Sequence, residues 1–212
     1  MRILSLNVAA PKKIRWRGKY VMTGIFKEPM IKRLLVKKLN IEGDAQADLR
    51  YHGGPFKAVY SYAGEHYLYW RRELGRPELP YAAFGENFTT SGLKEEFVMI
   101  GDQFRFGQAL LEAVQPRLPC YKLGLRFGDP LMPKKFLRSM RLGIYFQVIE
   151  EGAAAAQDEI IWVKKRRKSV LVSEIARLYA SPEAAGMRRL LDAKRLIPYW
   201  RAFFDKKLKE LR

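Results

Sequence analysis

The sequence predicts a mainly β fold, either a barrel or a sandwich with a few short helices, followed by a small C-terminal extension of three helices. Short β-prone runs separated by Gly and Pro recur from residue 1 to about residue 165. Apolar residues take up sustained helical spacing only after the basic run 164–168. Few long helices accompany the strands, which argues against a doubly wound α/β sheet. We therefore divide the chain into a β domain, residues 1–165, and a helical extension, residues 166–212.

The expected strands are β-prone runs that end near Gly or Pro. The first run alternates apolar and polar residues, and the second follows Gly18 as one arm of a hairpin. A break at Gly107-Gln108 divides a longer run into two strands. In chain order the runs are Ile3–Val8, Tyr20–Phe26, Ala58–Tyr62, the two halves of Phe104–Val114, Gly143–Ile149 and Glu159–Val163.

Two helices are expected within the β domain. The segment 64–74 places Tyr67, Trp70 and Leu74 on one face, three and four residues apart. The segment 119–126 begins with Pro119, and proline suits the first turn of a helix.

The extension contains three helical periods. The first covers 172–179, the second has Ser181 as N-cap with Pro182 at the first helical position, and the third begins near Pro198. Such short helices are not stable alone, so we expect them to pack on the β domain or on each other. The apolar face of the third helix is Trp200, Phe203, Phe204, Leu208 and Leu211.

Composition indicates a folded, basic protein. The chain has 212 residues with 48% hydrophobic residues and four Trp, which excludes a disordered basic tail. It has 40 Lys plus Arg against 22 Asp plus Glu, a net charge of +18. Residues 1–38 carry +10, residues 39–163 carry −2 and residues 164–212 carry +10. Two basic ends that flank a nearly neutral middle could form an anion-binding cleft between elements. The alternative is that these Lys and Arg residues are simply solvated on the surface.

The chain is expected to be cytoplasmic and to have no membrane association. No apolar run approaches the roughly 20 residues of a membrane span, and the first ten residues lack the apolar core of a signal peptide. One Cys and two His exclude an intramolecular disulfide and a four-ligand zinc site. The usual phosphate-loop, dinucleotide, zinc-protease and serine-hydrolase motifs are missing from the sequence.

Cys120 is the most informative single residue. It directly follows Pro119 at an expected helix start, and Arg117, Lys122 and Arg126 are close in sequence. Helix-end amides and cations both stabilise a thiolate, the form that attacks or binds metal. The alternative is that Cys120 is a small buried hydrophobe. A lone cysteine in redox chemistry needs another redox centre, which points to a metal or an external cofactor.

His52 precedes Gly53 and Gly54, whose exposed amides can hold an anion. The alternative for this segment is an ordinary Gly-Gly turn beside a surface histidine. His66, in the expected helix 64–74, is interpreted as a packing residue.

Seven motifs occur in an order that resembles one protein family. They are Asp44-Ala-Gln-Ala-Asp48, Tyr51-His52-Gly53-Gly54, Glu65-His66-Tyr67 with Trp70, Phe84-Gly85-Glu86-Asn87-Phe88-Thr89, Ile100-Gly101-Asp102, Gln115-Pro116-Arg117-Leu118-Pro119-Cys120-Tyr121-Lys122-Leu123 and Gly143-Ile144-Tyr145. Together they resemble the YiiM-type MOSC proteins, named for the molybdenum cofactor sulfurase C-terminal domain. The resemblance covers residues 1–165, and the segment 199–204 resembles part of the three-helix extension of this subfamily.

This resemblance implies a β-barrel that binds the pterin-based molybdenum cofactor, molybdopterin, with Cys120 as the metal ligand or sulfur carrier. It implies molybdenum-dependent reduction of N-hydroxylated compounds, including hydroxylaminopurine-type base analogues, in detoxification. A separate reductase would supply the electrons, pyridoxal phosphate would not be used, and a homodimer remains open. The residues expected to hold the cofactor are His52, Gly53, Gly54, Asn87, Arg117, Lys122, Arg126 and Arg141.

Two alternatives stay open at this stage. One is a sulfur carrier or cofactor chaperone with a persulfide on Cys120, and the other, ranked last, is a nucleic-acid binder that uses the basic surface. The chain also departs from the family pattern twice. Phe56 stands where an acidic residue is expected and Met140 where Gly is expected, which affects the expected substrate range more than cofactor binding.

Overall fold

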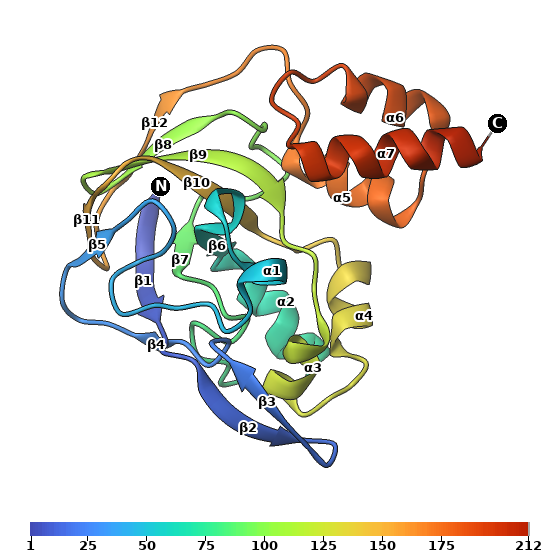
Figure 1. Cartoon of the computed structure of the whole chain (residues 1–212). Coiled ribbons are helices and arrows are strands. Elements are labelled where there is room, and N and C mark those ends of the chain that lie inside the picture. The colour runs from blue at the N-terminus through green and yellow to red at the C-terminus, as the bar shows by residue number, and fades with distance from the viewer. Residues whose placement is uncertain (212) are drawn as a thin grey trace.

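A mixed sheet of eight strands forms the body of the protein in the computed structural model, which describes residues 1–211 (Figure 1). All neighbouring strands are antiparallel except β6 and β7, which are parallel. The sheet order is β12 (Ile160–Lys164), β8 (Gln103–Phe106), β9 (Ala109–Pro116), β10 (Ile144–Glu150), β6 (Val59–Ala63), β7 (Phe88–Ser91), β1 (Arg2–Val8) and β4 (Glu28–Pro29).

The sheet dominates a mixed fold with several helices, but a closed barrel is not confirmed. Across residues 1–211 no strand ladder joins the two edge strands, β12 and β4. The start of β1 meets the segment before β12 through one isolated bridge, Arg2 with Glu159. The amide of Ile3 also donates to the carbonyl of Asp158 at 2.9 Å, which holds the curved sheet together at this point.

The predicted strands correspond to β1, β3, β6, β8, β9, β10 and β12, and the break at Gly107-Gln108 separates β8 from β9 as expected. The arm after Gly18 is β3 (Lys19–Thr23), which ends before Phe26. It pairs with β2 (Lys12–Trp16), a strand that the sequence analysis did not single out. Further strands without a sequence prediction are β4, β5 (Leu34–Val36), β7 and β11 (Gly152–Ala154).

The expected helices are present as α2 (Glu65–Glu73), α3 (Tyr121–Phe127), α5 (Val172–Ala180), α6 (Ala184–Leu191) and α7 (Pro198–Glu210). The N-cap prediction for α6 is wrong. That position is held by Glu183, so the helix starts two residues later than Ser181-Pro182 predicts. Unpredicted helical segments are α1 (Leu49–His52), a 3₁₀ turn at Pro55–Lys57 and α4 (Met132–Arg138). Within residues 1–211 no helix combines the length and apolarity that crossing a membrane requires.

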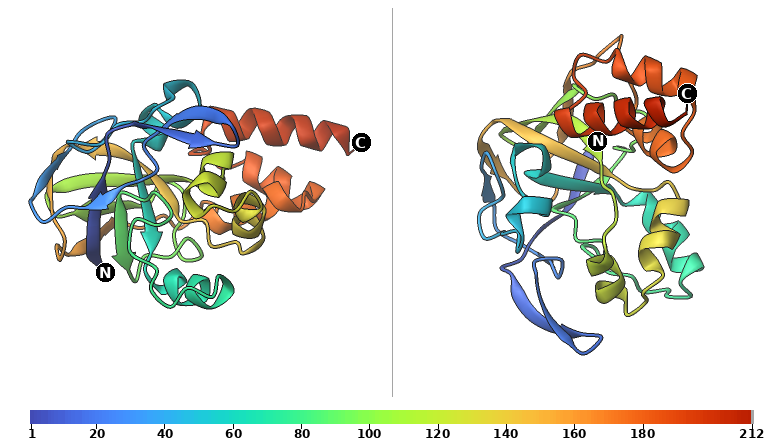
Figure 2. Two further views of the ribbon diagram at one scale, coloured as in Figure 1. Left: turned by 90° about the horizontal axis from the view of Figure 1, so that it is seen from below. Right: turned by 45° about the vertical axis from the view of Figure 1, so that its right-hand side comes forward.

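The C-terminal helices share one hydrophobic core with the sheet. Trp200 and Phe204 of α7 belong to the same buried cluster as Phe104 and Phe146 of the sheet. The indole Nε1 of Trp200 donates to Oε1 of Gln115, in β9, at 3.0 Å. Figure 2 shows α5, α6 and α7 grouped at one side of the sheet. This packing fixes α7 next to the loop that follows β9, where the candidate site lies.

A second buried cluster lies under α2, α3 and α4 and is rich in aromatic rings. Trp70 and Phe136 stack at 5.7 Å between centroids, and Phe84 packs against both. Leu123 and Phe127 of α3 belong to this cluster, and burying their apolar area stabilises the helix. Cys120 is therefore the N-cap of a helix that is fixed by its packing on this cluster.

Candidate functional site

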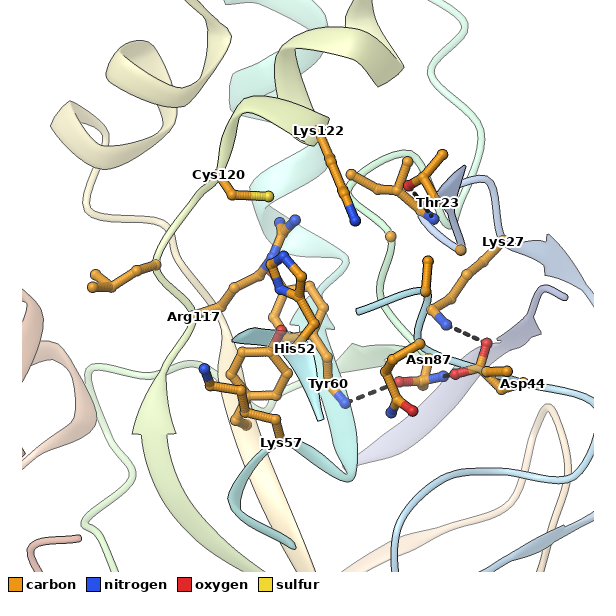
Figure 3. Close-up of a pocket in the computed structure, with 18 residues that line it drawn as sticks. Thr23, Lys27, Asp44, His52, Lys57, Tyr60, Asn87, Arg117, Cys120 and Lys122 are labelled. Atoms are coloured by element: carbon orange, nitrogen blue, oxygen red, sulfur yellow. Dashed lines mark hydrogen bonds and ion pairs between the residues drawn. The ribbon is translucent and has the colours of Figure 1, made fainter. Parts of the chain in front are cut away.

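Cys120 is the N-cap of α3, which confirms the expected position at a helix N-terminus. The residue has extended backbone angles, φ −122° and ψ 172°, and its side chain is half-buried. It lies on the wall of a pocket that encloses about 660 Å³ of space, its open mouth included. Figure 3 shows the sulfur of Cys120 on the same side of this pocket as Arg117 and Lys122. We call this space the charged compartment.

The charged compartment carries four cationic side chains, Arg117, Lys122, Lys57 and Lys27, against the carboxylate of Asp44. Among residues 1–211, Arg117 Nη1 is a buried side-chain nitrogen without a hydrogen-bond partner. A buried polar group without a partner costs about 1–3 kcal/mol, so this position suits an incoming acceptor. The compartment therefore favours an anionic ligand.

Aromatic rings hold Arg117 in place. Its guanidinium carbon lies 4.9 Å from the ring centroid of Tyr60 and 5.5 Å from that of Phe136. Cation–π contacts of this kind stabilise a buried guanidinium without using its N–H donors. Nη1 of Arg117 thus stays available to a ligand.

Lys27, Asp44 and Asn87 form a buried network on the opposite wall. The ammonium of Lys27 is paired with Oδ1 of Asp44, and Nδ2 of Asn87 donates to Oδ2 of Asp44 at 2.9 Å. Oδ1 of Asn87 accepts the backbone N–H of Tyr60 at 3.1 Å. Burial lowers the pKa of Lys27, and the carboxylate of Asp44 opposes this shift. Asn87 has its polar atoms engaged inside the protein, so it orders the wall of the compartment.

His52 is neutral at physiological pH. Burial, followed by the positive charges of Lys122, Lys57 and Arg117, lowers its pKa to about 4. A neutral imidazole can donate one hydrogen bond and accept another, but it adds no positive charge to the compartment.

A second compartment continues from the first and encloses about 1090 Å³, its open mouth included. The two share His52, Lys57, Leu118, Cys120, Lys122 and Tyr145. The remaining wall of the second compartment is largely aromatic and apolar, and we call it the tyrosine compartment. Its other lining residues are Asp48, Tyr51, Gln115, Pro116, Pro119, Tyr121, Tyr199 and Trp200. Cys120 therefore lies at the junction of a cationic space and an aromatic space.

The structure brings together five of the predicted site residues: Cys120, His52, Asn87, Arg117 and Lys122 line the charged compartment. The other four do not line either compartment. Gly53 ends α1, and Gly54 has φ +89°, a left-handed conformation that favours glycine. The guanidinium of Arg126 lies 4.9 Å from the Phe26 ring centroid, and that of Arg141 lies 4.1 Å from the Tyr69 ring centroid.

The two departures from the family pattern also lie outside both compartments. Phe56 packs against the main core, and its carbonyl accepts from Gln115 Nε2 at 2.8 Å. Met140 has φ +54°, a left-handed conformation that is uncommon for residues other than glycine. The glycine expected at position 140 thus has a backbone reason, and Met140 does not narrow either compartment.

Sequence reasoning missed several lining residues, of which Lys27, Lys57, Tyr60 and Tyr199 are the most important for the chemistry. The only sequence signal near Lys57 is the departure from the family pattern at the preceding residue, Phe56. Nothing in the local pattern around Lys27 or Tyr199 marks either residue as part of a site, because their partners come from distant segments.

The donor set fits a metal held by a single thiolate together with an anionic organic group. Among residues 1–211 no three His, Cys, Asp or Glu side chains gather as a metal-binding group. A metal at Cys120 would then take its remaining ligands from a cofactor, and the free Nη1 of Arg117 with the nearby lysines suits the negative charge of such a cofactor.

Fold and site together define a sheet-dominated protein whose pocket could accommodate an anionic group beside one thiol. The MOSC domain family model matches residues 48–161, more than half of the chain. The chain belongs to the MOSC domain family, and its full-length similarity to YiiM places it with the YiiM-type members.

The relatives support this assignment. The uncharacterized protein YflK of Bacillus subtilis is 41% identical over 97% of this chain and 93% of its own length. The crystal structure of YiiM from Geobacillus stearothermophilus has a TM-score of 0.82 and 32% identity, and the match covers 98% of both chains. A protein named reductase from Gibberella moniliformis is 34% identical over 68% of this chain, which corresponds to 26% of that protein.

Proposed function

We propose that this protein binds the molybdenum cofactor in the charged compartment and reduces N-hydroxylated compounds, hydroxylaminopurine-type base analogues among them, as a cytoplasmic detoxification enzyme. The observation that carries the proposal is the position of Cys120 between the cationic and the aromatic compartment. Membership of the MOSC family and the relative named reductase support it.

The cofactor would be held by residues that line the charged compartment. The Sγ of Cys120 would be the protein ligand of the metal, while Arg117 and Lys122 would bind the anionic part of the cofactor. When bound, the cofactor supplies a metal that changes oxidation state by two, as the reduction of one N–O bond requires. The lone cysteine then needs only to coordinate.

The overall reaction consumes two electrons and two protons, breaks the N–O bond of the substrate and yields an amine and water. Lys57 is our candidate for delivering a proton to the leaving oxygen. It lines both compartments, its Nζ donates to the carbonyl of Tyr51 at 2.6 Å, and burial lowers the pKa of its ammonium. A lower pKa makes this ammonium a readier proton donor.

The electrons would come from a separate protein, and we propose that it docks on the hairpin of β2 and β3. The hairpin projects from the body of the protein (Figure 1). It carries five Lys and Arg between residues 12 and 23 and no Asp or Glu, which suits an acidic electron donor. Its last strand leads directly into Thr23, Gly24 and Ile25, which line the charged compartment.

The experiment that tests the function compares the wild type with Cys120→Ala in protein from a host that makes the cofactor. We expect the variant to lose both molybdenum and the reduction of hydroxylaminopurine with reduced methyl viologen as electron source. Arg126→Ala is the matched control, because Arg126 lies outside both compartments and should retain both properties. A Cys120→Ala variant that keeps its molybdenum and its activity would refute the assignment.

Wild-type protein from the same host also tests the alternative function, in which Cys120 carries a persulfide and the protein is a sulfur carrier or cofactor chaperone. The half-buried thiol is reachable from both compartments, which keeps this chemistry open. Native mass spectrometry separates the two: bound cofactor adds the mass of a pterin with metal, whereas a persulfide adds one sulfur atom to the chain.

A further inference from the structure

The C-terminal helix α7 supplies part of the tyrosine compartment. Tyr199, in its first turn, lines this compartment together with Tyr51 of α1 and Tyr121 of α3. The family model ends at residue 161, so Tyr199 lies outside the matched domain. A segment beyond the MOSC match thus reaches the space beside Cys120.

The three tyrosines that line this compartment are largely exposed to solvent. Tyr51 is 67% exposed, Tyr121 56% and Tyr199 58%. Trp200, next to Tyr199, is fully buried. Exposed aromatic rings around a concave space are typical of binding sites, since a flat ligand can cover them.

Tyr199 is exposed, but its ring packs against the buried ring of Trp200. Its ring meets Trp200 edge-on, with centroids 5.1 Å apart and an interplanar angle of 72°. Trp200 is itself fixed by its hydrogen bond to Gln115 in the sheet. A ring that is ordered before binding loses little entropy when a ligand stacks on it.

We propose that Tyr199 is a specificity-determining residue of the enzyme, and that the tyrosine compartment binds the planar aromatic ring of the substrate. This inference rests on the proposed function, which places the reacting N–O bond at Cys120. The charged groups shared with the other compartment, Lys57 and Lys122, favour a neutral or anionic ring over a cationic one.

The test compares a planar and a small aliphatic substrate in the cofactor-loaded enzyme with reduced methyl viologen. Base–aromatic stacking corresponds to a change of about 5-fold to 150-fold in affinity. We expect Tyr199→Ala to raise KM for hydroxylaminopurine by a factor in this range and to leave KM for N-methylhydroxylamine and the molybdenum content unchanged. Tyr199→Phe keeps the ring and should retain the wild-type KM.

Phe97→Ala is the matched control, because Phe97 is a 60% exposed aromatic residue that lines neither compartment and lies outside the hairpin of β2 and β3. An unchanged KM for hydroxylaminopurine in Tyr199→Ala, or equal losses for both substrates, would overturn the proposal.

A binding measurement separates this inference from the proposed function. If the wild type reduces neither compound, the proposed function is wrong, and calorimetric titration with adenine still tests the ring site. The wild type and Tyr199→Phe should then bind adenine at least about fivefold more tightly than Tyr199→Ala. Equal adenine binding by all three proteins, including no binding by any, would refute the role of Tyr199.

Discussion

Replacing Asp44 by Asn tests the buried network that forms one wall of the charged compartment. The Asp44 and Lys27 side chains are 1% and 9% exposed, so the substitution leaves the Lys27 ammonium buried without its counter-charge. Oδ1 of Asp44 also accepts the backbone N–H of Ala9 at 2.9 Å, and Oδ2 accepts from Asn87. Asparagine has nearly the same shape but is neutral, and its Nδ2 would stand where Oδ2 accepts from Asn87, so the substitution removes the charge together with this hydrogen bond.

Breaking a buried ion pair at one partner costs about 3–5 kcal/mol. For a chain of this length each kcal/mol lowers Tm by about 2–4 °C, so Asp44→Asn should lower Tm by about 6–20 °C. Calorimetry or circular dichroism at pH 7 measures this shift. Asp205→Asn is the control, since its pair with Lys209 is exposed and is worth about 0.5 kcal/mol at most.

The pH dependence gives an independent check. Burial already holds the pKa of Lys27 below its ordinary value, and Asp44 opposes this. Without Asp44 the folded-state pKa falls further, while the unfolded value stays near 10.4. Between these two values the unfolded chain binds more protons, so stability rises with pH and the defect of Asp44→Asn should shrink toward pH 10. A loss below about 1 kcal/mol at pH 7, or a defect that grows toward pH 10, would refute this reasoning.

Three further outcomes are expected. The pKa of His52, measured by NMR, should be about 4 and should increase in Lys122→Ala, because a neighbouring positive charge is removed; an unchanged value would contradict the electrostatics. Its lowered pKa also means that His52 costs stability as pH falls from about 6.5 to about 4, visible in denaturant titrations. Gly143→Ala should lower Tm more than Gly18→Ala. Both glycines have positive φ, but only at Gly143 would the added methyl group clash with a backbone atom, the carbonyl oxygen of Ser61. Equal losses of Tm in the two variants would refute the crowding argument. The triple variant Lys12→Glu, Lys13→Glu and Lys19→Glu reverses three charges of the β2–β3 hairpin. It should weaken substrate reduction driven by an acidic flavoprotein reductase and leave reduction driven by reduced methyl viologen unchanged. Equal effects on both reactions would exclude the hairpin as the docking site.

The sequence by itself determined the features that depend on neighbouring residues. The break at Gly107-Gln108, the strand 144–150 and the helical periods after residue 165 could be predicted because side-chain alternation and turn chemistry are local. Cys120 at a helix N-terminus followed in the same way from the adjacent proline. These local signals, with the ordered motifs, were sufficient for the family and for the position of Cys120 at the start of α3.

Only the tertiary structure decided which residues share the pocket. Lys27, Asp44 and Asn87 come from three separate segments and meet through side-chain contacts that no local period records. Arg126 lies near Cys120 in sequence, but its guanidinium turns to the Phe26 ring instead of the pocket. Tyr199 reaches the site because Trp200 docks on Gln115, 85 residues away in the chain. Contacts between distant segments are set by the packing of the whole core, and this packing, not the local sequence, gives the site its second, aromatic compartment.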